Sequence, residues 1–167
     1  MLILGIDPGS AATGYGLVES RSGLLRALTH GTIAPPAKLP FLDRLPYIAA
    51  AIEVLIHRVA PDGAAIEDVF HSRNSRVALK LGCVRGAALL PILKARVPVF
   101  EYPPRLVKKA VTGSGAAEKE QVRRMVRILL GLDGGSLALD ASDALAVAIC
   151  HAHAHPYHRL RENLARA

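Results

Sequence analysis

The sequence is poor in cysteine, and this scarcity excludes several classes of protein. Its 167 residues contain two cysteines, Cys83 and Cys150, which lie far apart within apolar patterns typical of helices. Two such residues cannot build the dense disulfide framework of a small secreted domain, nor the closely spaced ligand set of a zinc site. We interpret both as buried free thiols in a reducing compartment, which predicts a cytoplasmic protein.

Long hydrophobic runs are also missing. Hydrophobic residues make up 51% of the chain, yet no stretch approaches the roughly 20 apolar residues that a membrane-spanning helix requires. The residues before Asp7 include no basic segment followed by a cleavage-type sequence, so no signal peptide is expected. The composition predicts one globular domain of ordinary size that is not associated with a membrane.

Acidic residues are scarce relative to basic ones. Lys and Arg number 21 against 14 Asp and Glu, which gives a formal net charge of +7 and a pI near 9.8. A compact domain with this excess favours a polyanionic partner, most often a nucleic acid, over an anionic membrane surface. The protein is therefore expected to bind nucleic acid.

The order of the hydrophobic patterns predicts an α/β fold. Short apolar runs bounded by Gly and Pro predict strands, and apolar repeats at helical spacing predict helices. The expected strands are residues 2–6, 15–18, 26–33, 64–66 and 97–102, and the expected helices are residues 42–59, 77–95, 105–111, 118–130 and about 140–153. Short connections predict three antiparallel strands followed by two parallel ones, in one mixed sheet flanked by helices. Residues 1–155 are interpreted as one domain, and residues 156–167 as a basic C-terminal tail that can be disordered.

Two acids directly follow predicted strands. Asp7 ends the first apolar run, just before Pro8-Gly9, and Glu67 ends the run Ala64-Ala65-Ile66. A carboxylate at such a position is held rigidly at an edge of the sheet where ligands commonly bind. The alternative for Asp7 is a carboxylate that only orders its turn. Gly14 and Gly16 predict that the next strand closely approaches a neighbour or a ligand.

A second pair of acids opens the last predicted helix. Asp140 and Asp143 are three residues apart, so they project from one face. Taken alone, the pair is explained by Asp140 as the N-cap and by a favourable first-turn charge at Asp143. Together with Asp7 and Glu67, they make four carboxylates that would repel one another unless a cation lay among them. Oxygen ligands without a Cys or His cluster indicate Mg²⁺ or Mn²⁺ rather than zinc.

Seven short motifs span the chain to about His153. They are Gly5-Ile6-Asp7-Pro8-Gly9-Ser10, Thr13-Gly14-Tyr15-Gly16, Ala65-Ile66-Glu67-Asp68-Val69-Phe70, Ala78-Leu79-Lys80-Leu81-Gly82, Pro98-Val99-Phe100-Glu101-Tyr102, Ala117-Glu118-Lys119 and Asp140-Ala141-Ser142-Asp143-Ala144-Leu145-Ala146. In this order they resemble the bacterial Holliday-junction resolvase family RuvC, a branch of the ribonuclease-H-like nucleases. As a set, the motifs are highly specific for that family.

The resemblance implies a ribonuclease-H-like fold, a homodimer, and Mg²⁺-dependent cutting of two opposed strands in a four-way DNA junction during recombination and repair. It implies that Asp7, Glu67, Asp140 and Asp143 are the catalytic metal ligands, although some relatives carry His at the position of Asp140. The chemistry agrees, since two ions can activate a water and stabilise the departing oxygen. Family members also work beside the RuvA–RuvB junction-migration complex.

Basic residues near these acids are the predicted DNA contacts. Arg73 and Arg76 follow Glu67 along the chain, and cations in such positions suit phosphate binding without base readout. Lys108 and Lys119 match family positions that contact the DNA backbone. Four further cations are instead interpreted as a solvated basic face: Lys109, Arg123, Arg124 and Arg127.

Other residues leave two interpretations open. Phe70 lies in a polar loop where the family uses an aromatic residue, and it could stack on an unpaired base or anchor the loop in the core. Gly82 and Gly86 form a helix face suited to a dimer contact, with packing of the helix on its own sheet as the alternative. The alternate spacing of His151, His153 and His155 resembles a metal tract, but surface histidines at a helix end are the favoured interpretation.

Three other functions are alternatives to junction cleavage. The opening motif also resembles the phosphate loop of actin-like ATPases and sugar kinases, but 167 residues leave no room for their second lobe. A non-catalytic junction-binding protein would be expected to have lost one of the four acids, and none is replaced. A ribonuclease-H-like nuclease acting on RNA–DNA hybrids is the third, and only a comparison of substrates can distinguish it.

Overall fold

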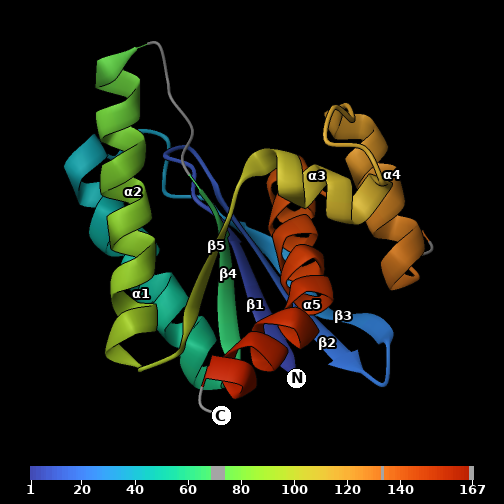
Figure 1. The fold of residues 1–167 in the computed structure, drawn as a ribbon. Helices are drawn as coiled ribbons and strands as arrows, with labels where there is room; N and C mark the ends of the chain where they lie inside the picture. The colour runs from blue at the N-terminus through green and yellow to red at the C-terminus, as the bar shows by residue number, and fades with distance from the viewer. Residues whose placement is uncertain (69–73, 133, 166–167) are drawn as a thin grey trace.

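A five-stranded mixed sheet forms the middle layer of the molecule (Figure 1). This computed structural model describes residues 1–68, 74–132 and 134–165, with side chains described as far as Ala154. The strands are β1 (Leu2–Asp7), β2 (Thr13–Arg21), β3 (Leu24–Ile33), β4 (Gly63–Glu67) and β5 (Val99–Tyr102). The helices are α1 (Phe41–Val59), α2 (Ser75–Lys94), α3 (Pro104–Thr112), α4 (Lys119–Leu130) and α5 (Leu139–Ala165).

The strand order is β3-β2-β1-β4-β5. Strands β1, β2 and β3 pair antiparallel, whereas β4 joins β1 and β5 joins β4 in parallel. Three antiparallel strands followed by two parallel ones is the order predicted from the short early connections and the later alternation of helix and strand. The predicted fold class is confirmed.

Helices cover both faces of the sheet, with α1 and α2 on one side and α3, α4 and α5 on the other (Figure 1). Alternation along the strands supplies both cores, because successive side chains point to opposite faces. Leu4 and Ile6 of β1 join the core under α1 and α2, while Ile3 joins the core under α5. Odd-numbered positions of β1 therefore face α5, which matters for Asp7.

Helix α5 crosses β1 and β2 at close range because glycines face it. A Cβ atom at Gly14 would overlap the backbone carbonyl of Asp140, and one at Gly5 would overlap that of Ala144. The predicted close approach of β2 to a neighbour is confirmed, and the neighbour is α5. Since the β1–β2 register pairs Asp7 with Gly14, this contact sets the start of α5 beside Asp7.

The last helix differs from its prediction at both ends. It was expected to end near His153 but runs to Ala165, so the predicted tail from residue 156 is helical up to that residue. Leu, Arg, Glu and Ala after Pro156 have high helix propensity, and an internal proline removes one backbone hydrogen bond without always ending a helix. At its start, the Ser142 amide donates to the Ala138 carbonyl. Asp140 therefore lies in the first turn and is not the N-cap, which was the alternative explanation for this residue.

Two expectations about buried groups also change. Both cysteines are free, but only Cys150 is buried, whereas Cys83 is half-buried. His151, expected at the surface, is 1% exposed, because its ring packs on Phe100 and its Nδ1 lies 2.7 Å from the Tyr102 hydroxyl. His153 is exposed, as predicted. No helix in the described part of the chain is long and apolar enough to cross a membrane.

Candidate active site

Two carboxylates lie side by side at one edge of the sheet. Ile6 of β1 pairs with Ile66 of the parallel strand β4, so Asp7 and Glu67 follow on adjacent strands. Ile6 and Ile66 both face α1 and α2, and side chains alternate along a strand. Asp7 and Glu67 therefore both point to the α5 side. This placement follows directly from the two apolar runs that end in an acid.

A hollow of about 340 Å³ opens at this edge. It is lined by Asp7 and Glu67 from the strands and by Asp143 from the first turns of α5. Lys108 of α3 and Lys119 of α4 line it as well, so cations from two helices face the three acids. Segments from the beginning, middle and end of the chain thus meet at one site.

Two further acids border this hollow differently from what the sequence predicts. Asp140 does not line it, although its charge contributes to raising the pKa of Asp7 and its side chain is therefore within electrostatic reach. Asp68, to which no role was assigned, does line it. The signal for Asp68 was its place directly after Glu67. The structure brings three of the four predicted acids into the hollow and leaves Asp140 at its margin.

Burial and like charge together perturb Asp7. Burial raises its pKa most, and the charges of Asp143, Glu67 and Asp140 add to the increase, so that the pKa moves from 3.8 to about 7. Lys119 opposes the increase. A carboxylate held in this way is stabilised by any cation that binds beside it.

Glu67 is perturbed in the same direction. Burial raises its pKa, as does the charge of Asp143, while Lys119 and Lys108 lower it. Lys119 in turn bonds Asp143, with its Nζ 3.0 Å from Oδ2, and this contact raises the pKa of the lysine. The lysine offsets only part of the negative charge that the acids bring together.

The backbone of Glu67 is held by an arginine that the sequence reasoning missed. Arg85 of α2 donates from Nη1 to the Glu67 carbonyl oxygen at 2.7 Å, and its Nη2 lies 2.8 Å from Glu101 Oε2. The Arg85 side chain is only 13% exposed. No sequence signal marks it, because Arg85 lies in a largely apolar helix and its partner Glu67 is 18 positions earlier, on a strand. Arg85 ties the end of β4 to α2 and β5.

Comparison with known proteins agrees with this geometry. The family model for crossover junction endodeoxyribonuclease RuvC matches residues 3–151. The chain belongs to the RuvC family. It is 48% identical over 165 residues to RuvC of Moorella thermoacetica, covering 99% of each chain, and 47% identical over 155 residues to RuvC of Syntrophomonas wolfei, covering 93% of this chain and 90% of that one. It also resembles the solved structure of Thermus thermophilus RuvC in complex with a Holliday junction substrate, with a TM-score of 0.86, 36% identity and 96% of each chain covered.

The donor atoms of this RuvC-family site suit a hard divalent cation. Asp7, Glu67 and Asp143 offer carboxylate oxygens, the ligands that Mg²⁺ and Mn²⁺ prefer. Burial and the nearby charges of Asp143, Glu67 and Asp140 raise the pKa of Asp7, and a bound cation would offset both effects. As the described side chains stand, no three His, Cys, Asp or Glu residues are arranged to hold an ion. The fit therefore lies in donor type and charge, and the carboxylates would have to draw together around a bound ion.

Of the remaining predicted DNA and dimer contacts, the structure describes some and not others. Arg76 is exposed at the start of α2, where its amide donates to the Asn74 side chain at 3.0 Å. Phe70 and Arg73 lie outside the described residues. Gly82 and Gly86 are exposed, and a Cβ at either would meet nothing within 4 Å. These two glycines therefore do not pack on the sheet of their own chain, which removes that alternative.

Proposed function

We propose that this protein resolves four-way DNA junctions by hydrolysing two symmetry-related phosphodiester bonds, in DNA recombination and repair in the cytoplasm. The observation that carries the proposal is the convergence of Asp7, Glu67 and Asp143 on one hollow, in a chain of the RuvC family. The T. thermophilus relative was solved with a Holliday junction substrate. The net charge of +7 supports a DNA substrate.

The proposed metal ligands are Asp7, Glu67 and Asp143, with Asp140 supporting them from the margin of the hollow. Two Mg²⁺ ions, or Mn²⁺ in their place, would lower the pKa of the attacking water and neutralise charge on the leaving oxygen. The carboxylates themselves serve to position the ions, so no Ser or Cys nucleophile is needed. The rigid strand ends keep Asp7 and Glu67 in place while Asp143 comes from α5.

Lys108 and Lys119 have a complementary role in this proposal. Both face the acids, and a scissile phosphate in the hollow would meet their ammonium groups. Lys119 is bonded to Asp143 at 3.0 Å, so DNA and metal binding would together compete for both members of this pair. Contacts of this kind hold the strand without reading its sequence.

A homodimer is proposed to form through α2. Leu79, Leu90 and Leu93 are 71%, 52% and 57% exposed, and their spacing places them on the same helical face as Gly82 and Gly86. Small residues between large apolar ones let a second helix approach closely. A second copy of the chain is the fitting occupant, because a two-fold junction needs two matching cuts.

The dimer proposal is tested with a charge on this face. We expect the double variant Leu79→Asp, Leu90→Asp to sediment as a monomer at concentrations where the wild type is a dimer. Leu42→Asp on α1 is the matched control, since Leu42 is 70% exposed but lies on the neighbouring helix. On a junction, the monomeric variant should nick single strands instead of making paired cuts. If the double variant stays dimeric, the dimer interface does not lie on this face of α2.

The function itself is tested by incubating the protein with a synthetic four-way junction, with and without Mg²⁺. We expect paired, symmetric cuts near the crossover only when the metal is present. Linear duplex DNA and an RNA–DNA hybrid serve as controls, and faster cutting of the hybrid would favour the general ribonuclease-H-like alternative. Junction binding without any cutting, under every metal tried, would favour the non-catalytic alternative.

Two other parts of the proposal rest on the family resemblance. Cooperation with the RuvA–RuvB complex stays a prediction from family resemblance. Stacking of Phe70 on an unpaired base stays a prediction as well, and Phe70→Ala tests it through the rate of junction cleavage.

A further inference from the structure

A second hollow lies on α4, outside the active site. It measures about 340 Å³ and is lined by three arginines of α4, Arg123, Arg124 and Arg127, and by Gly135 and Ser136 of the loop before α5. From sequence alone these arginines were interpreted as a solvated basic face. The structure gathers them around one concavity, so their arrangement needs a separate explanation.

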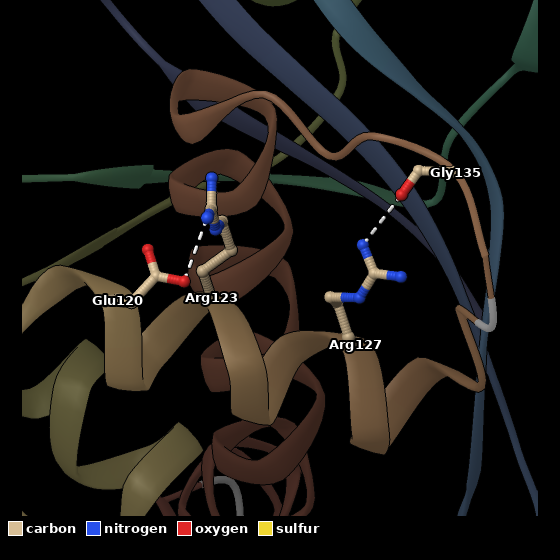
Figure 2. A network of polar contacts seen from close by, with 4 residues as sticks. All are labelled: Glu120, Arg123, Arg127 and Gly135. Carbon is tan, nitrogen blue, oxygen red and sulfur yellow. Dashed lines mark hydrogen bonds and ion pairs between the residues drawn. The ribbon is translucent and has the colours of Figure 1, made fainter.

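Two of the arginines are already held in place by the protein. Arg127 donates from Nη1 to the Gly135 carbonyl at 3.0 Å and from Nη2 to the Gly134 carbonyl at 3.4 Å. Figure 2 shows Arg123 and Arg127 extending from the same side of α4, with Glu120 beside Arg123. The Arg123–Glu120 pair, at 2.8 Å, is a surface contact between residues three apart and contributes little to stability. The Arg123 guanidinium has further N–H donors that remain available for a ligand.

The third arginine has no such contact. Arg124 is exposed and makes no hydrogen bond or ion pair with any described residue. Among the described residues that line this hollow, three guanidinium groups face one carboxylate, that of Glu120. None of its described lining residues is aromatic, so these residues offer no ring on which a base could stack. The chemistry suits phosphate groups and not whole nucleotides.

The position of the hollow relates it to the active site. Lys119, Arg123 and Arg127 are each four residues apart, so they form one stripe along α4. Lys119 reaches Asp143 in the active site, and Arg127 lies about 12 Å further along the helix. Measured from Lys119, Arg123 and Arg127 therefore lie roughly two and four nucleotides along one DNA strand.

We propose that the hollow of Arg123, Arg124 and Arg127 binds backbone phosphates of the junction arm that leaves the active site. This inference rests on the proposed function, because it takes the scissile phosphate to lie beside Lys119. The hollow then fixes the direction of the arm relative to the cut, and Arg127 keeps the loop before α5 closed while the other two arginines meet the phosphates.

Arg124→Gln is the sharpest test, because this side chain is not needed for any contact within the described protein. One lost phosphate contact lowers the slope of log K against log salt concentration by about 0.9. We expect this change for a four-way junction with long arms, which amounts to about tenfold weaker binding at 0.1 M salt. Cleavage at saturating protein should stay near wild type, since Arg124 does not line the active site.

Arg58→Gln on α1 is the matched control. Arg58 is also exposed, but α1 covers the opposite face of the sheet, so the slope should not change. Neutral methylphosphonate linkages, placed one at a time along the arm, locate the contact. A linkage roughly two to four nucleotides from the cut should weaken wild-type binding but leave the Arg124→Gln variant unaffected.

The outcomes separate this inference from the proposed function. If wild type binds and cuts the junction while Arg124→Gln shows the wild-type slope and affinity, the arginine hollow does not bind DNA and only this inference is wrong. If wild type neither binds nor cuts, the proposed function fails first. Competition by inorganic phosphate that weakens wild type and Arg124→Gln equally would also count against the hollow as a phosphate site.

Discussion

The two faces of the sheet are packed in different ways. On the α1–α2 face, branched side chains such as Leu4, Ile6 and Ile66 separate the sheet from its helices. On the opposite face, Gly5 and Gly14 let the backbone of α5 lie almost directly on the strands. The helices α1 and α2 have exposed leucines on their outer surface. The α5 side contains the carboxylates and the basic residues of α3 and α4.

The difference indicates how the molecule divides its tasks. A helix separated from a sheet by large side chains can shift slightly and repack. A helix resting on glycines has little such freedom, so the acids at its start are placed accurately relative to the strand ends. We infer that the α5 face is built for position, whereas α2 on the other face is built for association.

The largest expected effect comes from the carboxylate on the α5 face. Asp7→Asn should bind a junction but lose cleavage by at least about 10³-fold, because one ligand of the proposed metal site becomes neutral. Gel-based binding and single-turnover cleavage of the same junction measure the two properties. Cleavage at the wild-type rate would remove Asp7 from the site.

In the absence of metal, Asp7→Asn should be more stable than the wild type, by an amount that depends on pH. The pKa of Asp7 is about 7 in the folded protein against 3.8 ordinarily, so the native state binds the extra proton between these values. Stability from this group therefore falls as pH rises through this window. Asp7→Asn escapes this loss, which is at most about 4 kcal/mol. We expect its melting temperature to exceed that of wild type at pH 8, much less so at pH 5, and Mg²⁺ to reverse the order by stabilising wild type.

A change of similar type on each face tests the comparison itself. Gly14→Ala should destabilise the protein by about 3 kcal/mol or more, because its methyl group meets the Asp140 backbone. Gly82→Ala on α2 should instead stabilise the monomer by about 0.5–1 kcal/mol, since nothing lies within 4 Å of its Cβ. Chemical denaturation measures both. Equal effects at the two positions would show that the faces do not differ in this respect.

A smaller effect is expected for the contact that joins the two faces. Arg85 belongs to α2 yet holds the backbone of Glu67. Arg85→Gln should weaken Mg²⁺ binding by about 10–100-fold, as the loss of a group that orients a metal ligand commonly does. Thermal shift against Mg²⁺ concentration measures this without requiring cleavage. Arg85→Lys should recover part of the affinity; if both variants bind Mg²⁺ like wild type, Arg85 supports only the fold.

The central part of the site could be predicted because its signals are local. An apolar run that ends in an acid predicts a strand-end carboxylate, and this holds for Asp7 and Glu67. The cap position of α5 was misplaced by two residues, from Ala138 to Asp140, because a capping preference alone does not define where a helix begins. Arg85 carried no local signal, because its contact with Glu67 forms only when α2 packs beside β4. The spacing of the α4 arginines is a local signal for a basic stripe, but their hollow also requires the loop before α5.

The sequence by itself determined the order of strands and helices, the strand-end acids and the basic character of the chain, because these depend on local periodicity and composition. Tertiary structure alone decided that Asp143 lines the hollow while Asp140 lies at its margin, and that three arginines of α4 share a second one. The physical reason is that the first placement is set by how closely α5 packs on β1 and β2, through contacts between residues far apart in the chain. The second is set by how α4 meets the loop before α5, where Arg127 bonds the carbonyls of Gly134 and Gly135.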